Sequence, residues 1–257
     1  MGILEDKAVL ITGAASGIGR ATALEAQAEG ARLLLSDVDD EQGQALAREI
    51  ASRGGTASYE RCDVTDEAAV EALVRHAADK LGRLDGAFNC AGILGALGNV
   101  GDTAYEDWRR ILDVDLNGVF LCTKHEITLM AQQGAGSIVN MASAAGLIGW
   151  PAAAGYVAAK HGVVGLTKSA ALEYAPQGVR VNSMCPSYVL TPMVEKDLFH
   201  DALGDDQQLI EAARANHPIG RFGRPEEIAA ACVWLLSDKA SFVTGTAMSV
   251  DGGYTAP

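Results

Sequence analysis

The amino-acid sequence predicts an α/β fold built around a doubly wound parallel sheet. Short apolar segments with strand character alternate along the chain with longer segments of helical periodicity. The strand segments are apolar almost throughout, which is typical of parallel strands buried on both faces. Parallel neighbours need long crossover connections, and the intervening helical segments can supply them. We therefore expect helices on both faces of one sheet.

Seven apolar segments are expected to form the strands. They are residues 8–12, 32–37, 57–64, 84–92, 136–143, 179–186 and 247–253. Helical segments such as 17–30 and 40–54 separate them, and both of these close on a glycine, where a helix C-cap is expected. The irregular segment 187–224 follows the sixth strand at an edge where ligands bind in such folds, so we expect a helical substrate lid there. No linker or low-complexity tract divides the chain, which predicts a single domain over residues 1–257.

Composition argues against several classes of function. The net charge of -13 disfavours nucleic acids and anionic membranes as partners, because both require patches of Lys and Arg. The five cysteines contain no C-x-x-C motif, which favours reduced thiols, and the five histidines show no metal-binding spacing. The acidic N-terminal segment lacks the features of a secretory signal, and no stretch approaches a membrane span. These features predict a cytoplasmic protein without a bound metal.

A glycine-rich turn follows the first strand. The sequence TGAASGIG contains Gly13, Gly17 and Gly19 and opens the first helix. Glycines let the backbone bend tightly and approach a pyrophosphate, whose charge is stabilised by the helix N-terminus. The same spacing also fits a tight strand-to-helix connection without a ligand, so the turn alone leaves both interpretations open.

Asp37 ends the second expected strand, where a carboxylate can accept hydrogen bonds from the ribose hydroxyls of an adenine dinucleotide. Its charge would repel a 2′-phosphate, and neither 14–16 nor 38–40 contains an Arg or Lys to neutralise one. NAD is therefore the expected cofactor rather than NADP. Asp63, followed by Val64, ends the third expected strand, and the run NCAG from Asn89 ends the fourth, near the same crevice, although Asp63 and Asn89 could each instead form a turn.

Tyr156 and Lys160 lie four residues apart in the run GYVAAK. On an α-helix this spacing places both side chains on one face. The pair alone does not establish chemistry, because an exposed helix can carry it by chance. A free phenol has a pKa of about 10, too high for a base near neutrality, and an adjacent ammonium favours the phenolate.

Together these motifs resemble the short-chain dehydrogenase/reductase family over essentially the whole chain. The matching segments are TGAASGIG at 12–19, the acidic Asp37, CDV at 62–64, NCAG at 89–92, Ser143, YVAAK at 156–160, VRVNSMCP at 179–186 and the closing segment 220–253. The resemblance implies a Rossmann-type fold with seven parallel strands, a nicotinamide cofactor, and interconversion of a small-molecule alcohol and its ketone. It also implies a homotetramer.

By the same resemblance, Tyr156 is the general acid/base, Lys160 lowers its pKa and holds the nicotinamide ribose, and Ser143 orients the substrate oxygen. The backbone of Val189 and the side chain of Thr191 are implied to hold the carboxamide. The residues expected to bind the cofactor are Gly13, Ser16, Gly17, Ile18, Gly19, Asp37, Asp63, Val64, Asn89, Ala91, Gly92, Tyr156, Lys160, Val189 and Thr191.

Two residues depart from the family's pattern. Ser187 follows the Pro that ends the sixth strand, where the family usually has Gly. Asp115, in VDLNGVF, stands at the position of the family's catalytic Asn, and we expect it to take that catalytic place. Asn117 is not expected to substitute, because two residues along a helix point to opposite sides.

Other functions remain open from the sequence. A serine hydrolase is disfavoured because the chain contains no G-x-S-x-G elbow. A non-catalytic dinucleotide-binding regulator is supported by Asp115 and opposed by the presence of Ser143, Tyr156 and Lys160 together.

For an enzyme, the expected pocket is mainly apolar, which favours a cyclic or aryl secondary alcohol, or a dihydrodiol. Its expected residues are Leu94, Leu147, Trp150, Tyr188 and the apolar positions of 193–216.

Overall fold

A computed structural model describes residues 2–256, and its centre is one sheet of seven parallel strands in the order β3-β2-β1-β4-β5-β6-β7. The strands are β1 (Ala8–Thr12), β2 (Arg32–Asp37), β3 (Thr56–Arg61), β4 (Gly86–Asn89), β5 (Gly136–Met141), β6 (Val179–Pro186) and β7 (Ala247–Val250). All seven predicted strands are confirmed. The third, fourth, fifth and seventh end earlier than expected, because their last predicted residues belong to loops at the sheet edge.

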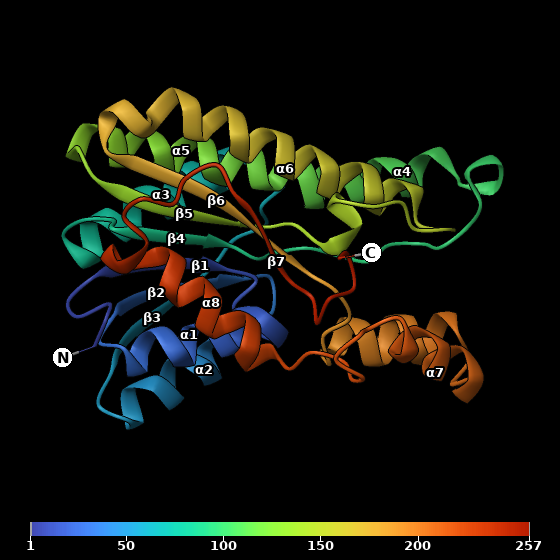
Figure 1. Cartoon of the computed structure of the whole chain (residues 1–257). Coiled ribbons are helices and arrows are strands. Elements are labelled where there is room, and N and C mark those ends of the chain that lie inside the picture. The colour runs from blue at the N-terminus through green and yellow to red at the C-terminus, as the bar shows by residue number, and fades with distance from the viewer. Residues whose placement is uncertain (1, 257) are drawn as a thin grey trace.

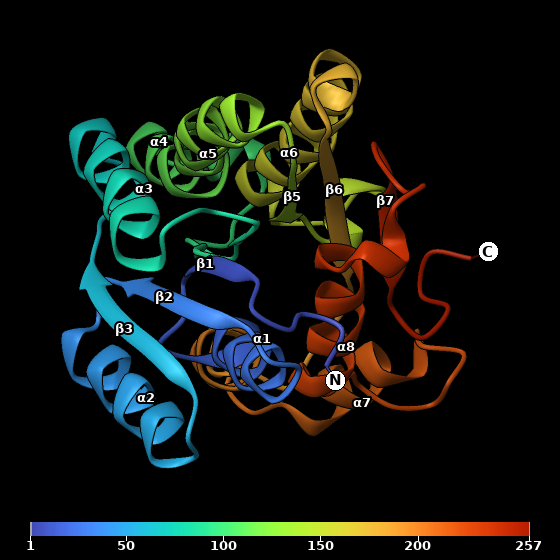
Figure 2. The ribbon, with the colours of Figure 1, turned by 90° about the vertical axis from the view of Figure 1, so that its left-hand side faces the viewer.

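Helices cover both faces of the sheet (Figures 1 and 2). The α-helices of the structure are α1 (Gly17–Ala28), α2 (Asp40–Ser52), α3 (Glu67–Leu81), α4 (Tyr105–Leu112), α5 (Val119–Gln133), α6 (Ala154–Tyr174), α7 (Gln207–Ala215) and α8 (Pro225–Leu236). Helices α1, α2 and α8 lie on one face, and α3 to α6 lie on the other. Gly30 and Gly54 follow the ends of α1 and α2 in the left-handed conformation, as their role in helix capping requires.

The alternation of side chains along β1 shows why the strand is apolar throughout. Val9 and Ile11 join the hydrophobic cluster under α1 and α8, whereas Ala8 and Leu10 join the cluster under α3 and α5. All four are buried. Successive residues of a strand point to opposite faces, so a strand covered on both sides favours apolar residues at every position.

The order of the strands in the sheet changes direction at β1. Strand β2 pairs with one edge of β1, and β4 pairs with the other. Helices leave to opposite faces at this point, so the loops beyond the carboxyl ends of β1 and β4 separate and leave a crevice, where doubly wound sheets bind their ligands.

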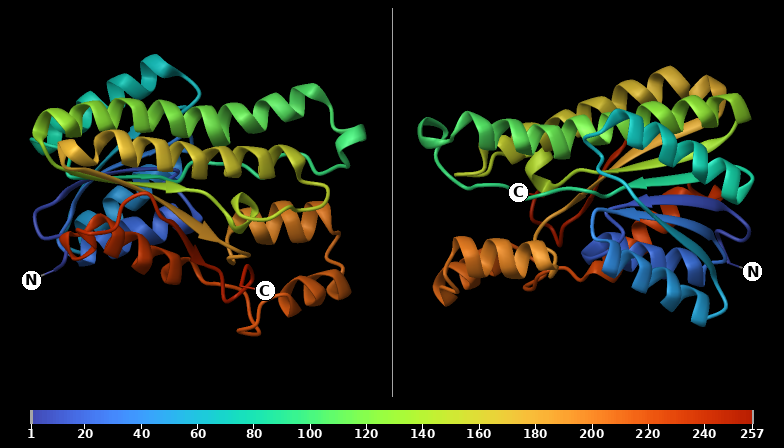
Figure 3. Two further views of the ribbon diagram at one scale, coloured as in Figure 1. Left: turned by 45° about the horizontal axis from the view of Figure 1, so that its top comes forward. Right: turned by 180° about the vertical axis from the view of Figure 1, so that it is seen from behind.

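The segment 187–224 follows β6 and is helical, as expected. It contains a π-helical stretch, Met193–Ala202, and helix α7. Figure 3 shows it standing beyond the carboxyl end of the sheet, away from the N-terminus. None of the helices in residues 2–256 is both long and apolar enough to cross a membrane.

Candidate active site

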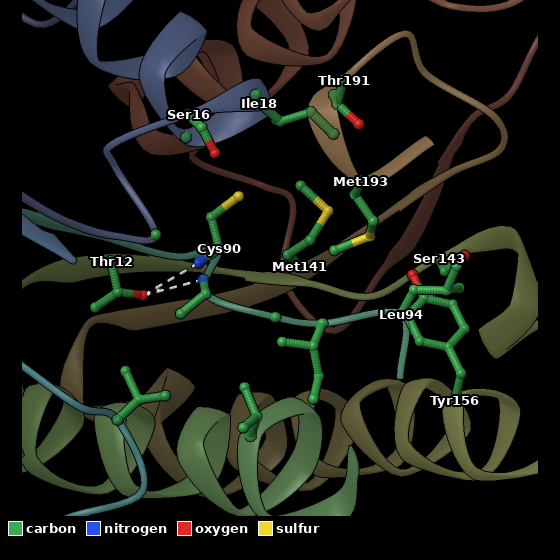
Figure 4. Close-up of a pocket in the computed structure, with 18 of the residues that line it drawn as sticks. Thr12, Ser16, Ile18, Cys90, Leu94, Met141, Ser143, Tyr156, Thr191 and Met193 are labelled. Carbon is green, nitrogen blue, oxygen red and sulfur yellow. Dashed lines mark hydrogen bonds between the residues drawn. The ribbon is translucent and has the colours of Figure 1, made fainter. Parts of the chain in front are cut away.

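A cleft of about 780 Å³ opens at the carboxyl ends of the strands. Residues at the ends of six strands or in the loops that follow them line it: Thr12, Asp37, Cys62, Cys90, Ser143 and Pro186. Figure 4 shows Ser143 and Tyr156 together at one end of this cleft, with Thr12 and Ser16 toward the other. Of the residues predicted to bind the cofactor, all except Asn89 line the cleft.

The glycines of the TGAASGIG turn let other backbone atoms of the protein approach the turn closely. Gly13 has φ +64°, and a Cβ added there would lie 2.6 Å from the backbone nitrogen of Ala91. At Gly19 an added Cβ would lie 2.1 Å from the carbonyl oxygen of Gly13. Ser16 caps α1 without a side-chain hydrogen bond, so the first backbone N–H groups of the helix are free to bind an anion. The turn therefore fits a dinucleotide pyrophosphate.

Thr12 fastens the glycine-rich turn to the neighbouring loop. Its Oγ1 accepts hydrogen bonds from the backbone nitrogens of Cys90 at 3.2 Å and Ala91 at 3.4 Å (Figure 4). These bonds hold the end of β4 beside the end of β1, where the two sides of the crevice begin. Our sequence reasoning did not assign Thr12 a role, although its place at the start of TGAASGIG was the available signal.

Asp37 lies at the cleft with its carboxylate held by backbone groups. Oδ2 accepts a hydrogen bond from the nitrogen of Ala15 at 2.9 Å, and Oδ1 accepts one from Val38 at 2.7 Å. The sheet register also brings Arg61 opposite Asp37, a neighbour that the sequence reasoning missed. The Arg61 guanidinium donates to the carbonyl of Val38 and lies 3.4 Å from a carboxylate oxygen of Asp40. Arg61, which the register places beside Asp37, thus already has an acidic partner.

Asp63 and Asn89 have different positions. Asp63 lines the cleft, and its Oδ1 also accepts from the backbone nitrogen and hydroxyl of Thr65, so it forms the turn that the sequence allowed. Asn89 is buried beneath the cleft and donates to Glu126 at 2.9 Å and to Asn140 at 3.0 Å. Its side chain points toward α5 rather than toward the ligand side, so the structure gives it a place in the scaffold.

The three residues expected to carry the chemistry come together. Ser143 follows β5, and its Oγ lies 3.5 Å from the carbonyl oxygen of Pro186 and accepts from the nitrogen of Ala145. Tyr156 and Lys160 lie one turn apart on α6, with the lysine Nζ 5.4 Å from the centre of the tyrosine ring. Lys160 Nζ also donates to the carbonyl of Met141 at 3.2 Å. All three side chains are buried but border the cleft.

Asp115 lies directly behind this group. It occupies a π-helical stretch, Asp113–Gly118, a form often found at functional sites. Its Oδ1 accepts from the nitrogen of Ile93 at 2.8 Å, and its Oδ2 lies 3.5 Å from Lys160 Nζ. Asn117 is exposed and bonds back to Asp113, as expected for a residue on the opposite side of the helix. Asp115 does not line the cleft, but its two polar contacts, Ile93 and Lys160, both do.

Burial and charge act against each other on these groups. Burial raises the pKa of Tyr156, the Lys160 ammonium opposes that rise, and the Asp115 carboxylate adds to it. For Lys160, burial is the largest single influence and acts to lower the pKa, but the charges of Asp115, Tyr156 and Cys90 together outweigh it, so the pKa is raised. Burial likewise raises the pKa of Asp115, against the lysine ammonium. Lys160 therefore lowers the phenol's pKa as expected, although in this structure burial has the larger effect.

Most of the expected substrate pocket is present. Leu94, Trp150 and Tyr188 line the cleft together with apolar side chains of the 187–224 segment, Met193, Val194 and Leu198. Leu147 does not line it and instead packs with the cluster that contains Ala142, Val163 and Val164. The short helical turn Ala144–Gly146 after β5 directs Leu147 away from the cleft.

Ser187, the first departure from the family's pattern, makes two contacts that a glycine could not. Its Oγ lies 2.8 Å from Nε2 of His217 and donates to the carbonyl of Asp251 at 3.1 Å. His217 is buried, and its Nδ1 lies 3.1 Å from the carbonyl of Ala213 on α7. The sequence reasoning gave His217 no role, because the contact spans 30 residues and no motif marks it.

A pyrophosphate cradle, a carboxylate at the ribose position and a buried Ser-Tyr-Lys group in one cleft define a nicotinamide-dependent oxidoreductase on a Rossmann-type fold. Residues 13–255 match the family model described as enoyl-(acyl carrier protein) reductase. The chain belongs to the short-chain dehydrogenase/reductase family.

Two relatives and one solved structure show where the chain lies in that family. It is 46% identical to a 2,5-dichloro-2,5-cyclohexadiene-1,4-diol dehydrogenase of Sphingobium indicum, over 100% of both chains. It is 45% identical to a cyclohexanol dehydrogenase of Acinetobacter sp., over 98% of this chain and 96% of that protein. The crystal structure of levodione reductase superposes with a TM-score of 0.95 at 40% identity, covering 98% of each chain.

Proposed function

We propose that this protein is an NAD-dependent dehydrogenase that interconverts a cyclic secondary alcohol and its ketone. The main support is the convergence of Ser143, Tyr156 and Lys160 at one end of a cleft whose other end fits a dinucleotide. The substrate class is supported by the apolar lining and by relatives named for cyclohexadienediol and cyclohexanol dehydrogenation.

The residues would divide the reaction as follows. When bound, the nicotinamide supplies the hydride acceptor or donor. In alcohol oxidation Tyr156 takes the hydroxyl proton, and in ketone reduction it returns one. Ser143 hydrogen-bonds the same substrate oxygen, and the Lys160 ammonium favours the phenolate form of the tyrosine. Asp115 acts as a positioning residue, because its carboxylate holds Lys160 in an ion pair and favours the charged form of the lysine.

NAD is proposed over NADP because Asp37 presents a negative charge at the ribose position. The positive charge of Arg61 acts against this argument, but its ion pair with Asp40 partly compensates that charge. The test is kcat/KM with each cofactor. We expect a clearly higher kcat/KM with NAD. Equal values, or a higher value with NADP, would contradict the assignment of NAD as the cofactor.

A non-catalytic dinucleotide-binding protein is the competing function, supported by Asp115 at the catalytic Asn position. It is opposed by the intact Ser-Tyr-Lys group. The two are separated by NADH absorbance after mixing the protein with NAD and a panel of cyclic alcohols. Cofactor binding without turnover across the panel favours the regulator.

The chain is also proposed to act as a single domain within a homotetramer. Phe120 on α5 is 47% exposed and Leu172 on α6 is 81% exposed, which leaves large apolar side chains on the helical face for a second copy to cover. Light scattering should give the mass of four chains, and a monomer would contradict the proposal. The free thiols of all five cysteines fit a reducing compartment such as the cytoplasm.

A further inference from the structure

Three aromatic side chains meet at the cleft, and two of them line it. The ring centres of Trp150 and Tyr188 are 4.8 Å apart, and those of Tyr188 and Tyr254 are 5.9 Å apart. Trp150 Nε1 donates a hydrogen bond to the Tyr254 hydroxyl at 2.9 Å. Trp150 and Tyr188 line the cleft, and the Trp150 ring centre is 6.4 Å from that of Tyr156. We call Trp150, Tyr188 and Tyr254 the aromatic trio.

The aromatic trio has more hydrogen-bond donors than it can satisfy by itself. The indole N–H of Trp150 can only donate, and the oxygen of Tyr254 accepts it. Within residues 2–256 the hydroxyl of Tyr188 makes no hydrogen bond, and Tyr188 lines the cleft. Its O–H group is therefore available to an oxygen atom of a ligand.

The hydroxyl of Tyr188 is held ready for this role. Its ring packs edge-on against His217, with the ring centres 5.6 Å apart, and His217 is anchored in turn to Ser187 and to the carbonyl of Ala213. Burial raises the pKa of Tyr188, so the group stays a neutral phenol and keeps its proton near neutral pH. A donor fixed in place before binding loses little entropy when a ligand arrives.

We propose that the aromatic trio is a second polar subsite, which binds a neutral oxygen atom on the substrate ring at a distance from the reacting carbinol. Tyr188 and Trp150 face the same cleft as Tyr156, so one small ring can contact both ends of the pocket. The trio contains no cation to balance a carboxylate, which favours a second hydroxyl or carbonyl group. The preferred substrate is a cyclic diol or hydroxyketone. This inference rests on the proposed alcohol dehydrogenase activity.

The first test uses the unaltered protein with two substrates of matched shape. The kcat/KM for oxidation of trans-cyclohexane-1,4-diol is compared with that for trans-4-methylcyclohexanol, in which a methyl group replaces the distant hydroxyl. We expect the diol to be favoured about tenfold, since a site built to hydrogen-bond a hydroxyl discriminates against an analogue that lacks it. An equal or higher value for the methyl compound overturns the subsite. Turnover of neither compound would count against the proposed function instead.

The second test removes the hydroxyls. In Tyr188→Phe and Tyr254→Phe, the ratio of the two kcat/KM values should fall several-fold toward equality, and the ratio cancels any general loss of activity. Tyr105→Phe is the matched control, because that tyrosine is exposed on α4 outside the cleft, and it should keep the wild-type ratio. A wild-type ratio in both Tyr188→Phe and Tyr254→Phe would show that the aromatic trio does not read the second oxygen.

Discussion

Glu126 provides a test of the buried scaffold beneath the cleft. It lies on α5, fully buried, and its Oε2 accepts a hydrogen bond from Asn89 at 2.9 Å. Its Oε1 has no hydrogen-bond partner in the part of the chain that the structure describes. Burial raises its pKa from 4.5 to about 7, with only the Asn89 amide acting against it. The perturbation we consider is Glu126→Gln, which keeps the shape and an acceptor for Asn89 but cannot ionise.

The sign of the effect follows from the direction of the pKa change. The folded protein holds the Glu126 proton more tightly than the unfolded chain does, so its stability is complete at low pH and falls as pH rises from about 4.5 to about 7. A pKa that moves from 4.5 to about 7 corresponds to about 3 kcal/mol of unfolding free energy. The Glu126→Gln variant loses none of this unfolding free energy as pH rises, because it cannot ionise. In wild type, part of this stability is already lost at about pH 5, so relative to wild type the variant should gain about 2 to 3 kcal/mol between about pH 5 and about pH 8.

The measurement is chemical denaturation of both proteins at these two pH values and one protein concentration, since assembly would otherwise change the apparent stability. Glu71→Gln, an exposed residue of α3, is the control for loss of a carboxylate without burial and should show little relative change. A difference between Glu126→Gln and wild type that is the same at both pH values would refute the reasoning, because burial would then not be holding the proton.

Three further predictions concern the cleft. Tyr156→Phe should lower kcat at least a hundredfold, on the order of what general acid–base catalysis contributes, while NAD binding measured by calorimetry is retained; a variant with more than about a tenth of wild-type kcat contradicts the mechanism. Asp37→Ala should narrow the kcat/KM preference for NAD over NADP, and an unchanged ratio would assign the discrimination to another residue. Asp115→Asn should keep activity and move the rising limb of the kcat/KM profile for alcohol oxidation to lower pH by less than about one unit, because the carboxylate that raises the pKa of Tyr156 is removed. A shift to higher pH, or an inactive variant, would argue against this electrostatic role.

Local patterns made the sheet and much of the cleft predictable. The glycine-rich turn and the pair Tyr156 and Lys160 are encoded in short runs whose geometry a strand end or one helical turn fixes. Contacts between distant segments were not predictable in this way. Trp150 meets Tyr254 across 104 positions, and Arg61 lies beside Asp37 only because β3 pairs with β2 in that register.

Asn89 shows the limit of reasoning from strand ends. Its position at the end of β4 predicted a ligand contact, and the neighbouring Ala91 and Gly92 do line the cleft. Asn89 itself is the last residue of the strand, so the alternation of side chains still applies to it and turns its amide toward Glu126. A residue inside a strand follows the pleat, whereas one just beyond it can turn toward the crevice.

The surroundings of Asp115 explain how the chain accommodates a carboxylate where its family has an amide. The two groups that meet it are the backbone N–H of Ile93 and the ammonium of Lys160, and both are donors. One carboxylate oxygen accepts from Ile93 and the other forms an ion pair with Lys160 at 3.5 Å, whereas the NH₂ of an asparagine would have to turn away from the ammonium. The same charge that satisfies Lys160 raises the pKa of Tyr156, so the substitution strengthens the lysine's position while making the phenol a weaker acid. In this cleft Lys160 therefore acts against two influences that raise the pKa of Tyr156, burial and the Asp115 carboxylate. The pKa of the catalytic phenol thus depends on a residue behind the cleft as well as on residues that line it.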